Sequence, residues 1–285
     1  MEGAQNDCGG LSVGTTLGPY RLEAVLGEGG MGCVFRARRE SDGETVALKV
    51  LKPGLATQEE YARRFAHEAR ATAEVHHPHL VALLEVASYD GRPCLAMQYL
   101  TGRSLEDRLH AGPLGLAEAV TVCRQVAAGL DTLHAAGLVH RDIKSANVVV
   151  DEGGSATLTD FGLARGEGYS WLTQPGQVMG TIDYMAPELI MGERATPRSD
   201  VYSLGCVVWE CLAGRRPFAG AEMTALAMAI LSEPPQDPCA GRTDASVEFS
   251  LRVREALAKD PARRPASAGA YAERLAEALP VAHGG

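Results

Sequence analysis

The spacing of apolar positions divides the chain into a strand-rich first third and a helical remainder. Across residues 20–98, short runs rich in Val, Leu and aromatic residues alternate with Gly-rich or Asp-Gly turns, which is typical of antiparallel strands. One helical segment interrupts these runs at residues 59–75, where apolar or small residues recur at helical spacing before His77-Pro78 ends the pattern. Residues 1–18 are Gly-rich and polar, and we interpret them as a loose leader.

From residue 105 onward the apolar spacing is mostly helical. A long periodic segment at residues 116–136 is followed by Gly137, a suitable C-cap residue. Two short strand-like runs come next, near residues 148–151 and 156–159, and a loop covers about residues 165–181. Further helices are predicted at residues 198–213, 223–231, 247–257 and 266–279. Strands followed by helices predict an α+β fold with two lobes.

Composition narrows the functional classes. The chain has 285 residues, 46% of them hydrophobic, and a formal net charge of -9. This acidic balance argues against a nucleic-acid-binding protein, which usually carries a basic excess. No apolar run approaches the roughly 18 residues of a membrane span, and the first residues lack the features of a signal peptide. We therefore expect a cytoplasmic protein, or the cytoplasmic part of a longer membrane-anchored one, without membrane or nucleic-acid contacts in this chain.

The seven cysteines are scattered and form no C-x-x-C pair. Five of them lie in apolar segments: Cys33, Cys94, Cys123, Cys206 and Cys211. Buried, reduced thiols are the expectation for such positions, and this agrees with a cytosolic compartment.

A glycine-rich turn provides the first candidate chemistry. Residues 27–34 read G-E-G-G-M-G-C-V, a G-x-G-x-x-G-x-V pattern whose backbone N–H groups can approach phosphate oxygens. A dinucleotide-binding loop has the same glycine spacing but opens a helix, and a plain hairpin turn is a further alternative. Because residues 33–38 look like a returning strand and not like a helix, we favour a hairpin over the dinucleotide-binding loop.

A lysine completes this first group. Lys49 ends the apolar run V-A-L-K, where a surface lysine would be the ordinary interpretation. Together with the preceding glycines it can instead orient the α- and β-phosphates of a nucleotide. Glu68 lies on the inward stripe of the predicted helix and is our preferred partner for Lys49. The rival acids are Glu59, Glu60 and Glu74.

The decisive segment is H-R-D-I-K-S-A-N at residues 140–147, followed by Asp160-Phe161-Gly162. Phosphoryl transfer needs an aligned hydroxyl and compensation of charge. Asp142 can accept or orient the hydroxyl proton, and Lys144 can offset charge at the γ-phosphate. Asn147 and Asp160 supply the hard oxygen atoms that Mg²⁺ prefers. Each residue alone could be a turn or cap residue, but their joint order and spacing favour catalysis.

These motifs resemble those of the protein kinase superfamily, most closely the Hanks-type serine/threonine kinases of bacteria. The resemblance covers roughly residues 20–280 and includes A-P-E at 186–188 and D-V-Y-S-L-G at 200–205. It implies a bilobal α+β kinase fold. Residues 19–98 would form a small N-lobe, with an antiparallel sheet and one main helix, and residues 99–280 would form a larger, mostly helical C-lobe. Residues 281–285 would be a tail.

The resemblance also implies the roles of individual residues. Asp142, Lys144, Lys49 and Glu68 would be catalytic, and Asn147 and Asp160 would bind Mg²⁺, with Mn²⁺ as an alternative. Arg264 would pair with Glu188, and Asp200 would brace the catalytic loop. The expected contacts to ATP are Leu26, Gly27, Glu28, Gly29, Gly30, Met31, Gly32, Val34, Ala47, Lys49, Met97, Gln98, Leu100, Asn147, Val149 and Asp160.

Lys144 and Thr181 resemble the serine/threonine branch, so protein serine and threonine hydroxyls are the expected acceptors. A phosphate on the activation loop would pair with Arg141 and order the segment. Candidate sites are Tyr169, Ser170, Thr173 and Thr181, and we favour autophosphorylation at Thr173. Self-association during activation is a further implication of the family.

Two other classes compete with an active protein kinase. One is a nucleotide-binding scaffold with little turnover, and the other is a kinase-like enzyme that phosphorylates small molecules. The scaffold is disfavoured because Lys49, Asp142 and Asp160 are all present. The small-molecule enzyme is disfavoured because the A-P-E triplet and the long activation segment would build a platform for a peptide.

Overall fold

The structure is a computed structural model, and it describes residue 8 and residues 10–29, 32–52, 59–161, 182–218 and 222–280. The chain divides into two compact units. Unit 1 comprises residues 1–76 and 81–101, and unit 2 comprises residues 77–80 and 102–285. Within the described residues, none of the helices has both the length and the apolar character needed to cross a membrane.

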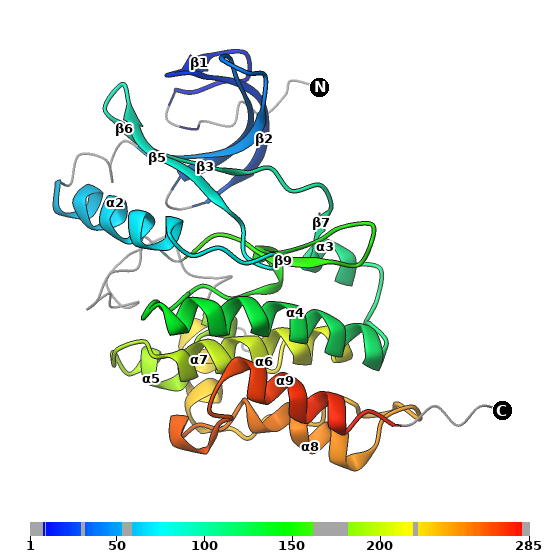
Figure 1. Cartoon of the computed structure of the whole chain (residues 1–285). Helices are drawn as coiled ribbons and strands as arrows, with labels where there is room; N and C mark the ends of the chain where they lie inside the picture. Colours follow the sequence, from blue (N-terminus) through cyan, green and yellow to red (C-terminus); the bar gives the residue numbers. More distant parts are fainter. Residues whose placement is uncertain are drawn as a thin grey trace. The chain divides into compact units, whose positions relative to one another are not determined.

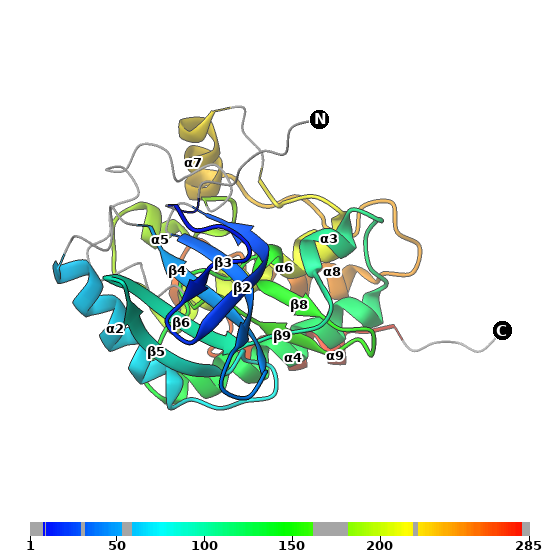
Figure 2. The same ribbon diagram turned by 90° about the horizontal axis from the view of Figure 1, so that it is seen from above.

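Unit 1 is built on a six-stranded antiparallel sheet in the order β1-β2-β3-β4-β6-β5. Its strands are β1 (Thr16–Leu17), β2 (Tyr20–Glu28), β3 (Gly32–Arg39), β4 (Thr45–Leu51), β5 (Leu83–Tyr89) and β6 (Arg92–Gln98). The described helix of this unit, α2 (Glu59–Ala73), runs alongside β5 (Figures 1 and 2). The predicted strands and helix of the N-lobe are therefore present.

Alternation along β3 and β4 gives the sheet two different faces. Phe35, Ala37 and Leu48 are fully buried on one face, whereas Val34 and Ala47 are only partly buried on the other. Successive side chains of a strand point to opposite sides, so this register assigns the two sets to opposite faces. The buried face carries the hydrophobic cluster of unit 1.

The described part of the leader is attached to this sheet, which differs from the loose segment predicted for residues 1–18. Leu17 of β1 is buried, and Gly14 donates a 2.8 Å backbone hydrogen bond to Leu22 of β2. Gly18, at φ 55°, turns the chain so tightly that a Cβ atom there would lie 2.3 Å from the Tyr89 ring. Any residue with a side chain would therefore be strained at this turn between β1 and β2.

The expectation that Cys33 is a free thiol is wrong, because Cys33 forms a disulfide with Cys8 of the leader. Both half-cystines are buried within the cluster of unit 1. The other five cysteines are free and buried, as predicted for four of them. The pair was not predicted because 25 residues separate the two cysteines, and only the pairing of β1, β2 and β3 brings them together.

Unit 2 combines a small antiparallel sheet with a mostly helical body (Figure 1). The sheet contains β7 (Arg103–Ser104), β8 (Val148–Val150) and β9 (Ala156–Leu158). The helices are α3 (Leu105–Leu109), α4 (Leu116–Ala135), α5 (Pro187–Ile190), α6 (Pro197–Ala213), α7 (Met223–Ser232), α8 (Val247–Glu255) and α9 (Ala268–Glu277). The bounds of α4, α6, α7, α8 and α9 agree closely with the predicted helices, whereas the short helices α3 and α5 were not predicted.

Helix α6 is the centre of the core of unit 2. Helices α4, α8 and α9 pack against it, and Tyr202 and Trp209 are fully buried. Thr196 and Ser199 form a reciprocal capping box at its start, and Gly214 ends it in the left-handed conformation at φ 65°. The helix is therefore held at both ends, which makes it a rigid support for the loops that contact it.

Candidate active site

The catalytic-loop residues predicted from the sequence are in contact with each other. Lys144 Nζ lies 3.1 Å from Asp142 Oδ2, and Asn147 Nδ2 donates to the same oxygen at 3.0 Å. Asn147 Nδ2 also donates to the backbone carbonyl of Asp142 at 2.8 Å. The 3₁₀ turn at Ser145–Asn147 places the lysine and the asparagine on the same side of the loop as the aspartate. Two side chains of the same short segment therefore help to orient this carboxylate.

Asp200, in the first turn of α6, holds the backbone of the catalytic loop. Its buried carboxylate accepts hydrogen bonds from the backbone N–H groups of His140, at 2.8 Å, and Arg141, at 3.0 Å. His134, in the last turn of α4, lies 2.8 Å from the same carboxylate. Asp200 thus braces the loop as the resemblance implies, and His134 is an additional support that the sequence did not indicate.

His140 has a structural role beneath the loop. Burial lowers its pKa, although the nearby carboxylates of Asp200 and Asp142 oppose this shift. Its Nδ1 accepts a hydrogen bond from the backbone N–H of Asp142, at 3.3 Å, so the ring proton of the neutral imidazole belongs on Nε2. Nε2 then donates to the carbonyl of Thr159 at 3.2 Å. A neutral His140 therefore joins the catalytic loop to the residue before Asp160.

The two predicted metal ligands lie at the ends of β8 and β9. The side-chain nitrogen Nδ2 of Asn147 donates to Asp142, so the side-chain oxygen Oδ1 is the atom suited to bind a cation. The backbone N–H of Thr159 donates to the backbone carbonyl of Asn147 at 2.7 Å, which joins the segment before Asp160 to Asn147. An amide oxygen and a carboxylate are hard donors that fit Mg²⁺ or Mn²⁺.

Backbone strain marks the same region. The described residues other than glycine with positive φ are Asp90, Arg141 and Asp160, at 53°, 67° and 54°. Asp90 belongs to the Asp-Gly turn between β5 and β6, where such a conformation is ordinary. Arg141 and Asp160 flank the candidate chemistry, and strained residues of this kind are concentrated at functional sites because the surrounding structure must hold them.

The glycine-rich segment forms a hairpin in unit 1, as predicted. Strands β2 and β3 pair in antiparallel fashion, and Gly29 N–H donates to the Gly32 carbonyl at 2.9 Å. The dinucleotide-binding alternative is therefore excluded, because no helix follows the glycines in this described segment. A Cβ atom on Gly32 would lie 2.1 Å from the carbonyl oxygen of Val50, whereas one on Gly27 would meet no described atom within 4 Å. Gly32 is thus required for the approach of β3 to β4, and Gly27 leaves room beside the hairpin.

The other predicted nucleotide contacts of unit 1 lie on one face of the sheet. Val34 is in register with Lys49, and Ala47 is in register with Met97. Lys49 alternates with the buried residues of β4, which places it on the same face as Val34 and Ala47. Glu68 is partly buried on α2. The Lys49–Glu68 ion pair remains a prediction.

Three further predicted nucleotide contacts belong to unit 1 and one belongs to unit 2. Leu26, in β2, is exposed, and Gln98 ends β6 and donates its backbone N–H to the Ala82 carbonyl at 2.9 Å. Leu100 follows in the connection to unit 2. Val149 is on β8, in unit 2. Gly30, Met31, Tyr169, Ser170, Thr173 and Thr181 lie outside the described residues.

A hydrogen-bonded chain connects the segment before the A-P-E triplet to the catalytic loop. Tyr184 donates to Glu210 of α6 at 2.6 Å, and its hydroxyl lies 2.9 Å from Ser145 Oγ. Arg216 pairs with Asp183 at 2.5 Å. This chain was not predicted, because its members come from four separate segments with no shared motif.

The pair of Arg264 and Glu188 is present, as the resemblance implies. Two parallel hydrogen bonds of 2.7 Å join the guanidinium to the carboxylate, and both side chains are buried. Burial alone would raise the pKa of Glu188, but the hydrogen bonds and charge of Arg264 outweigh it and leave this pKa below its ordinary value. The end of the activation segment is thus attached to the body of unit 2 by a buried ion pair.

The glycine hairpin and strand lysine of unit 1, and the braced H-R-D loop of unit 2, are each features of the protein kinase domain. The family model for the protein kinase domain matches residues 20–276, and the chain belongs to that family. The serine/threonine-protein kinase PknJ of Mycobacterium tuberculosis is 39% identical over 275 residues, which cover 94% of this chain. PknA of the same species, also a serine/threonine-protein kinase, is 39% identical over 93% of this chain.

The chain spans 47% of the length of PknJ and 62% of the length of PknA. Among solved structures, the kinase domain of M. tuberculosis PknI matches with a TM-score of 0.74 and 29% identity, covering 94% of this chain and 99% of that one. These matches confirm the predicted bilobal α+β kinase fold and the resemblance to bacterial Hanks-type kinases.

Proposed function

We propose that the chain is a serine/threonine protein kinase that transfers the γ-phosphoryl group of ATP to protein hydroxyls with Mg²⁺, or with Mn²⁺ as the alternative metal. The observation that carries this proposal is the contact of Asp142 with both Lys144 and Asn147, on a loop whose backbone is held by Asp200. Family membership and the serine/threonine-protein kinases among the relatives support the same conclusion.

The roles of the catalytic loop follow from these contacts. Bound ATP and Mg²⁺ supply the phosphoryl group and most of the charge neutralisation. Asp142 orients the acceptor hydroxyl and takes up its proton, and the two hydrogen bonds to Oδ2 keep the carboxylate in one plane. Lys144 is close enough to Asp142 to place its charge beside the transferred group.

The binding roles are distributed over both units. In unit 2, Asn147 and Asp160 would hold the metal ion through oxygen atoms. In unit 1, the glycine hairpin and Lys49 would bind the phosphates, and Glu68 would position Lys49. Val34, Ala47 and Val149 would contact the adenine ring, and the backbone between Met97 and Leu100 would provide its hydrogen bonds.

Activation by autophosphorylation belongs to the same proposal, with Thr173 as the favoured site. Phosphopeptide mass spectrometry of active protein tests it, and an unmodified Thr173 in a fully active preparation would contradict it. The acceptors are proposed to be serine and threonine residues of proteins, because the A-P-E anchor supports a segment that can bind a peptide.

The proposed function is tested by Asp142→Asn. Asparagine preserves the shape of the side chain and still offers an oxygen to Lys144 and Asn147, but it cannot take up a proton. Transfer of radioactive phosphate from [γ-³²P]ATP to myelin basic protein should fall roughly 10²- to 10⁴-fold, while ATP affinity stays nearly unchanged.

Glu152→Gln is the matched control, because this exposed residue lies in the turn between β8 and β9. It should retain wild-type transfer. If wild type and Asp142→Asn transfer phosphate equally slowly while both bind ATP, the scaffold function is correct instead. Rapid phosphorylation of small hydroxyl compounds without transfer to protein would favour the small-molecule enzyme.

A further inference from the structure

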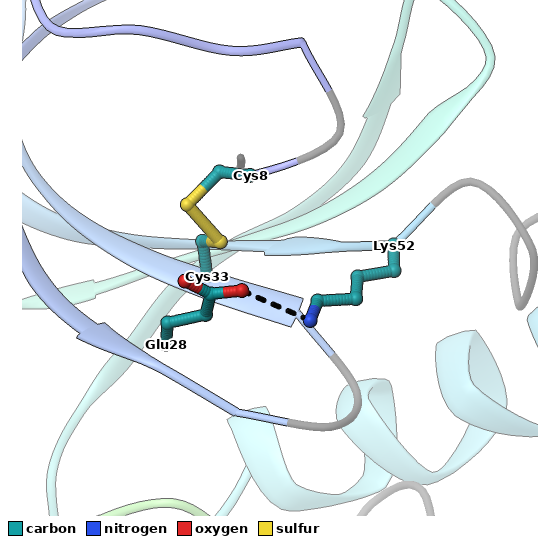
Figure 3. Close-up of a disulfide and its surroundings, with 4 residues drawn as sticks. All are labelled: Cys8, Glu28, Cys33 and Lys52. Atoms are coloured by element: carbon teal, nitrogen blue, oxygen red, sulfur yellow. Dashed lines mark hydrogen bonds and ion pairs between the residues drawn. A yellow bond between two sulfur atoms is a disulfide. The ribbon is translucent and has the colours of Figure 1, made fainter. Parts of the chain in front are cut away.

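The Cys8–Cys33 disulfide lies at the base of the glycine hairpin (Figure 3). Cys33 directly follows Gly32 and is in register with Glu28 on β2 and with Val50 on β4. Cys8 belongs to the leader, and its Cα atom is 5.8 Å from that of Cys33. The disulfide therefore connects the leader covalently to the segment that is proposed to bind the phosphates of ATP.

The leader is attached at two places, and the disulfide is one of them. At its other end, β1 pairs with β2, and backbone hydrogen bonds join Thr15 and Gly14 to Leu22. Between these attachments Leu11 packs against the buried cluster of unit 1, whereas residues 12–14 are exposed. The leader thus lies over the buried face of the sheet, opposite the face that carries Val34 and Lys49.

Among the described residues, an ion pair also restrains the base of the hairpin. Glu28 Oε1 lies 3.1 Å from Lys52 Nζ, and both side chains are about one-third exposed (Figure 3). An ion pair with this exposure contributes little, because water screens it and both side chains lose rotamer freedom. The covalent bond at Cys33 is therefore the stronger restraint on the start of β3.

The state of the other cysteines indicates that disulfides are not a general means of stabilisation in this chain. Five of the seven cysteines are unpaired and buried, and burial raises the pKa of the Cys94 thiol to about 11, which makes it unreactive. A chain with mostly free thiols suits a compartment rich in thiol reductants, where disulfides are usually transient and redox-sensing. Cys8 and Cys33 are the exception in this chain.

A metal site is the competing interpretation. Ligand atoms of Cys8, Glu28 and Cys33 lie within 4.8 Å of one another, a distance that a bound cation would allow. Divalent zinc binds cysteine as a thiolate, however, and two sulfur atoms bonded to each other are not thiolates. The structure therefore favours redox chemistry at this pair.

We propose that Cys8–Cys33 is a redox modification site, and that its reduction loosens the glycine hairpin and weakens the binding of ATP. The reductant is a dithiol, either a small molecule or a protein. This inference rests on the proposed function, because it takes the hairpin to be the phosphate-binding element.

The exchange proceeds in two steps. A thiolate of the dithiol attacks Sγ of Cys8, the S–S bond breaks, and Cys33 leaves as a thiolate that takes up a proton. The second thiol of the reductant then displaces Cys8, which also becomes a thiol. Two electrons and two protons enter the protein, and the reductant is oxidised to its disulfide. We assign the attack to Cys8 because Cys33 is flanked by paired strands on both sides.

Reduction should lower the affinity for ATP because the start of β3 is then no longer preorganised. In the oxidised protein, the start of β3 is already restrained before ATP binds. In the reduced protein, this segment must be ordered during binding, which should weaken ATP affinity roughly five- to tenfold. The antiparallel pairing of β2 with β3 remains in the reduced protein and prevents a complete loss of the hairpin.

The test compares ATP affinity, measured by calorimetry, in oxidised and dithiothreitol-reduced protein. Titration with a thiol reagent under denaturing conditions should count five thiols in the oxidised form and seven in the reduced form. Cys8→Ala should bind ATP like the reduced wild type and should not respond to reductant. Cys94→Ala removes a buried thiol from the same cluster and should respond like wild type.

Equal ATP affinity in both redox states would overturn this inference and leave the proposed function intact. Seven thiols after treatment with an oxidant would overturn it as well. Failure of both redox forms to bind ATP would refute the proposed function together with the inference. Since the two wild-type forms have the same sequence, the comparison does not depend on whether a variant folds.

Discussion

Replacing Glu188 by glutamine should destabilise the protein strongly, because it leaves a buried charge without its partner. The Arg264 side chain is fully buried, and all five of its N–H groups are used. Two donate to the carboxylate of Glu188, and three donate to the backbone carbonyls of Arg198, Ala258 and Lys259. In Glu188→Gln, one amide N–H group would face a guanidinium N–H group instead of an acceptor.

The magnitude follows from this geometry. Removal of one member of a buried, hydrogen-bonded ion pair costs about 3–5 kcal/mol, because the remaining charge is neither solvated nor paired. Native domains are stable by about 5–15 kcal/mol, so the loss is a large fraction of the total. With a urea m-value of about 3 kcal/mol/M, the midpoint of unfolding should fall by about 1–1.7 M.

Glu248→Gln is the matched control for the urea experiment. Glu248 is 66% exposed in its side chain and pairs with Arg252 at 3.3 Å across one turn of α8. Exposed pairs of this kind contribute about 0.3–0.5 kcal/mol, so the midpoint should barely move. If the two variants unfolded at similar urea concentrations, the reasoning from burial would be refuted.

The same ion pair predicts a pH dependence. The pKa of Glu188 is lower in the folded protein than in the unfolded chain, where it has its ordinary value. Its contribution is therefore fully present above the unfolded pKa and is lost as the pH falls through the folded pKa. On acidification below the ordinary glutamate pKa, wild type should lose stability more steeply than Glu188→Gln. Parallel curves would contradict this assignment.

Two further predictions concern the packing of unit 2. Gly205→Ala should lower the melting temperature, because the new Cβ atom would lie 2.6 Å from the Cβ atom of Ala256. Overpacking of this kind costs about 1–3 kcal/mol, which exceeds the gain of about 1 kcal/mol in helix propensity. A raised melting temperature would contradict this prediction. Burial lowers the pKa of Lys259 to about 8, below its unfolded value, so stability should rise relative to Lys259→Met between about pH 8 and 10. A constant difference in melting temperature over that range would refute it.

Local patterns in the sequence were enough to predict the elements of the fold. The helix over residues 116–136 was recognised from its apolar spacing, and Gly137 indeed ends it at φ 76°. The glycine hairpin was recognised because a strand pattern follows Gly32. These signals are local, since they depend on side chains within a few turns or along one strand.

The order of the H-R-D and D-F-G motifs predicted which catalytic-loop residues would meet. Asp142, Lys144 and Asn147 are close in the sequence, so one turn is enough to bring their side chains into contact. The sequence did not indicate that His134 supports Asp200, because 66 residues separate them and α4 must first pack against α6.

What the sequence determined by itself was the set of elements and the chemistry available within each short segment. Only the tertiary structure decided which distant groups share a site, as for Cys8 with Cys33 and His134 with Asp200. The physical reason is that periodicity and capping act over a few residues, whereas such contacts depend on strand register and helix packing across the whole unit. A cysteine in a polar leader carries no local signal of the sulfur atom that it will meet.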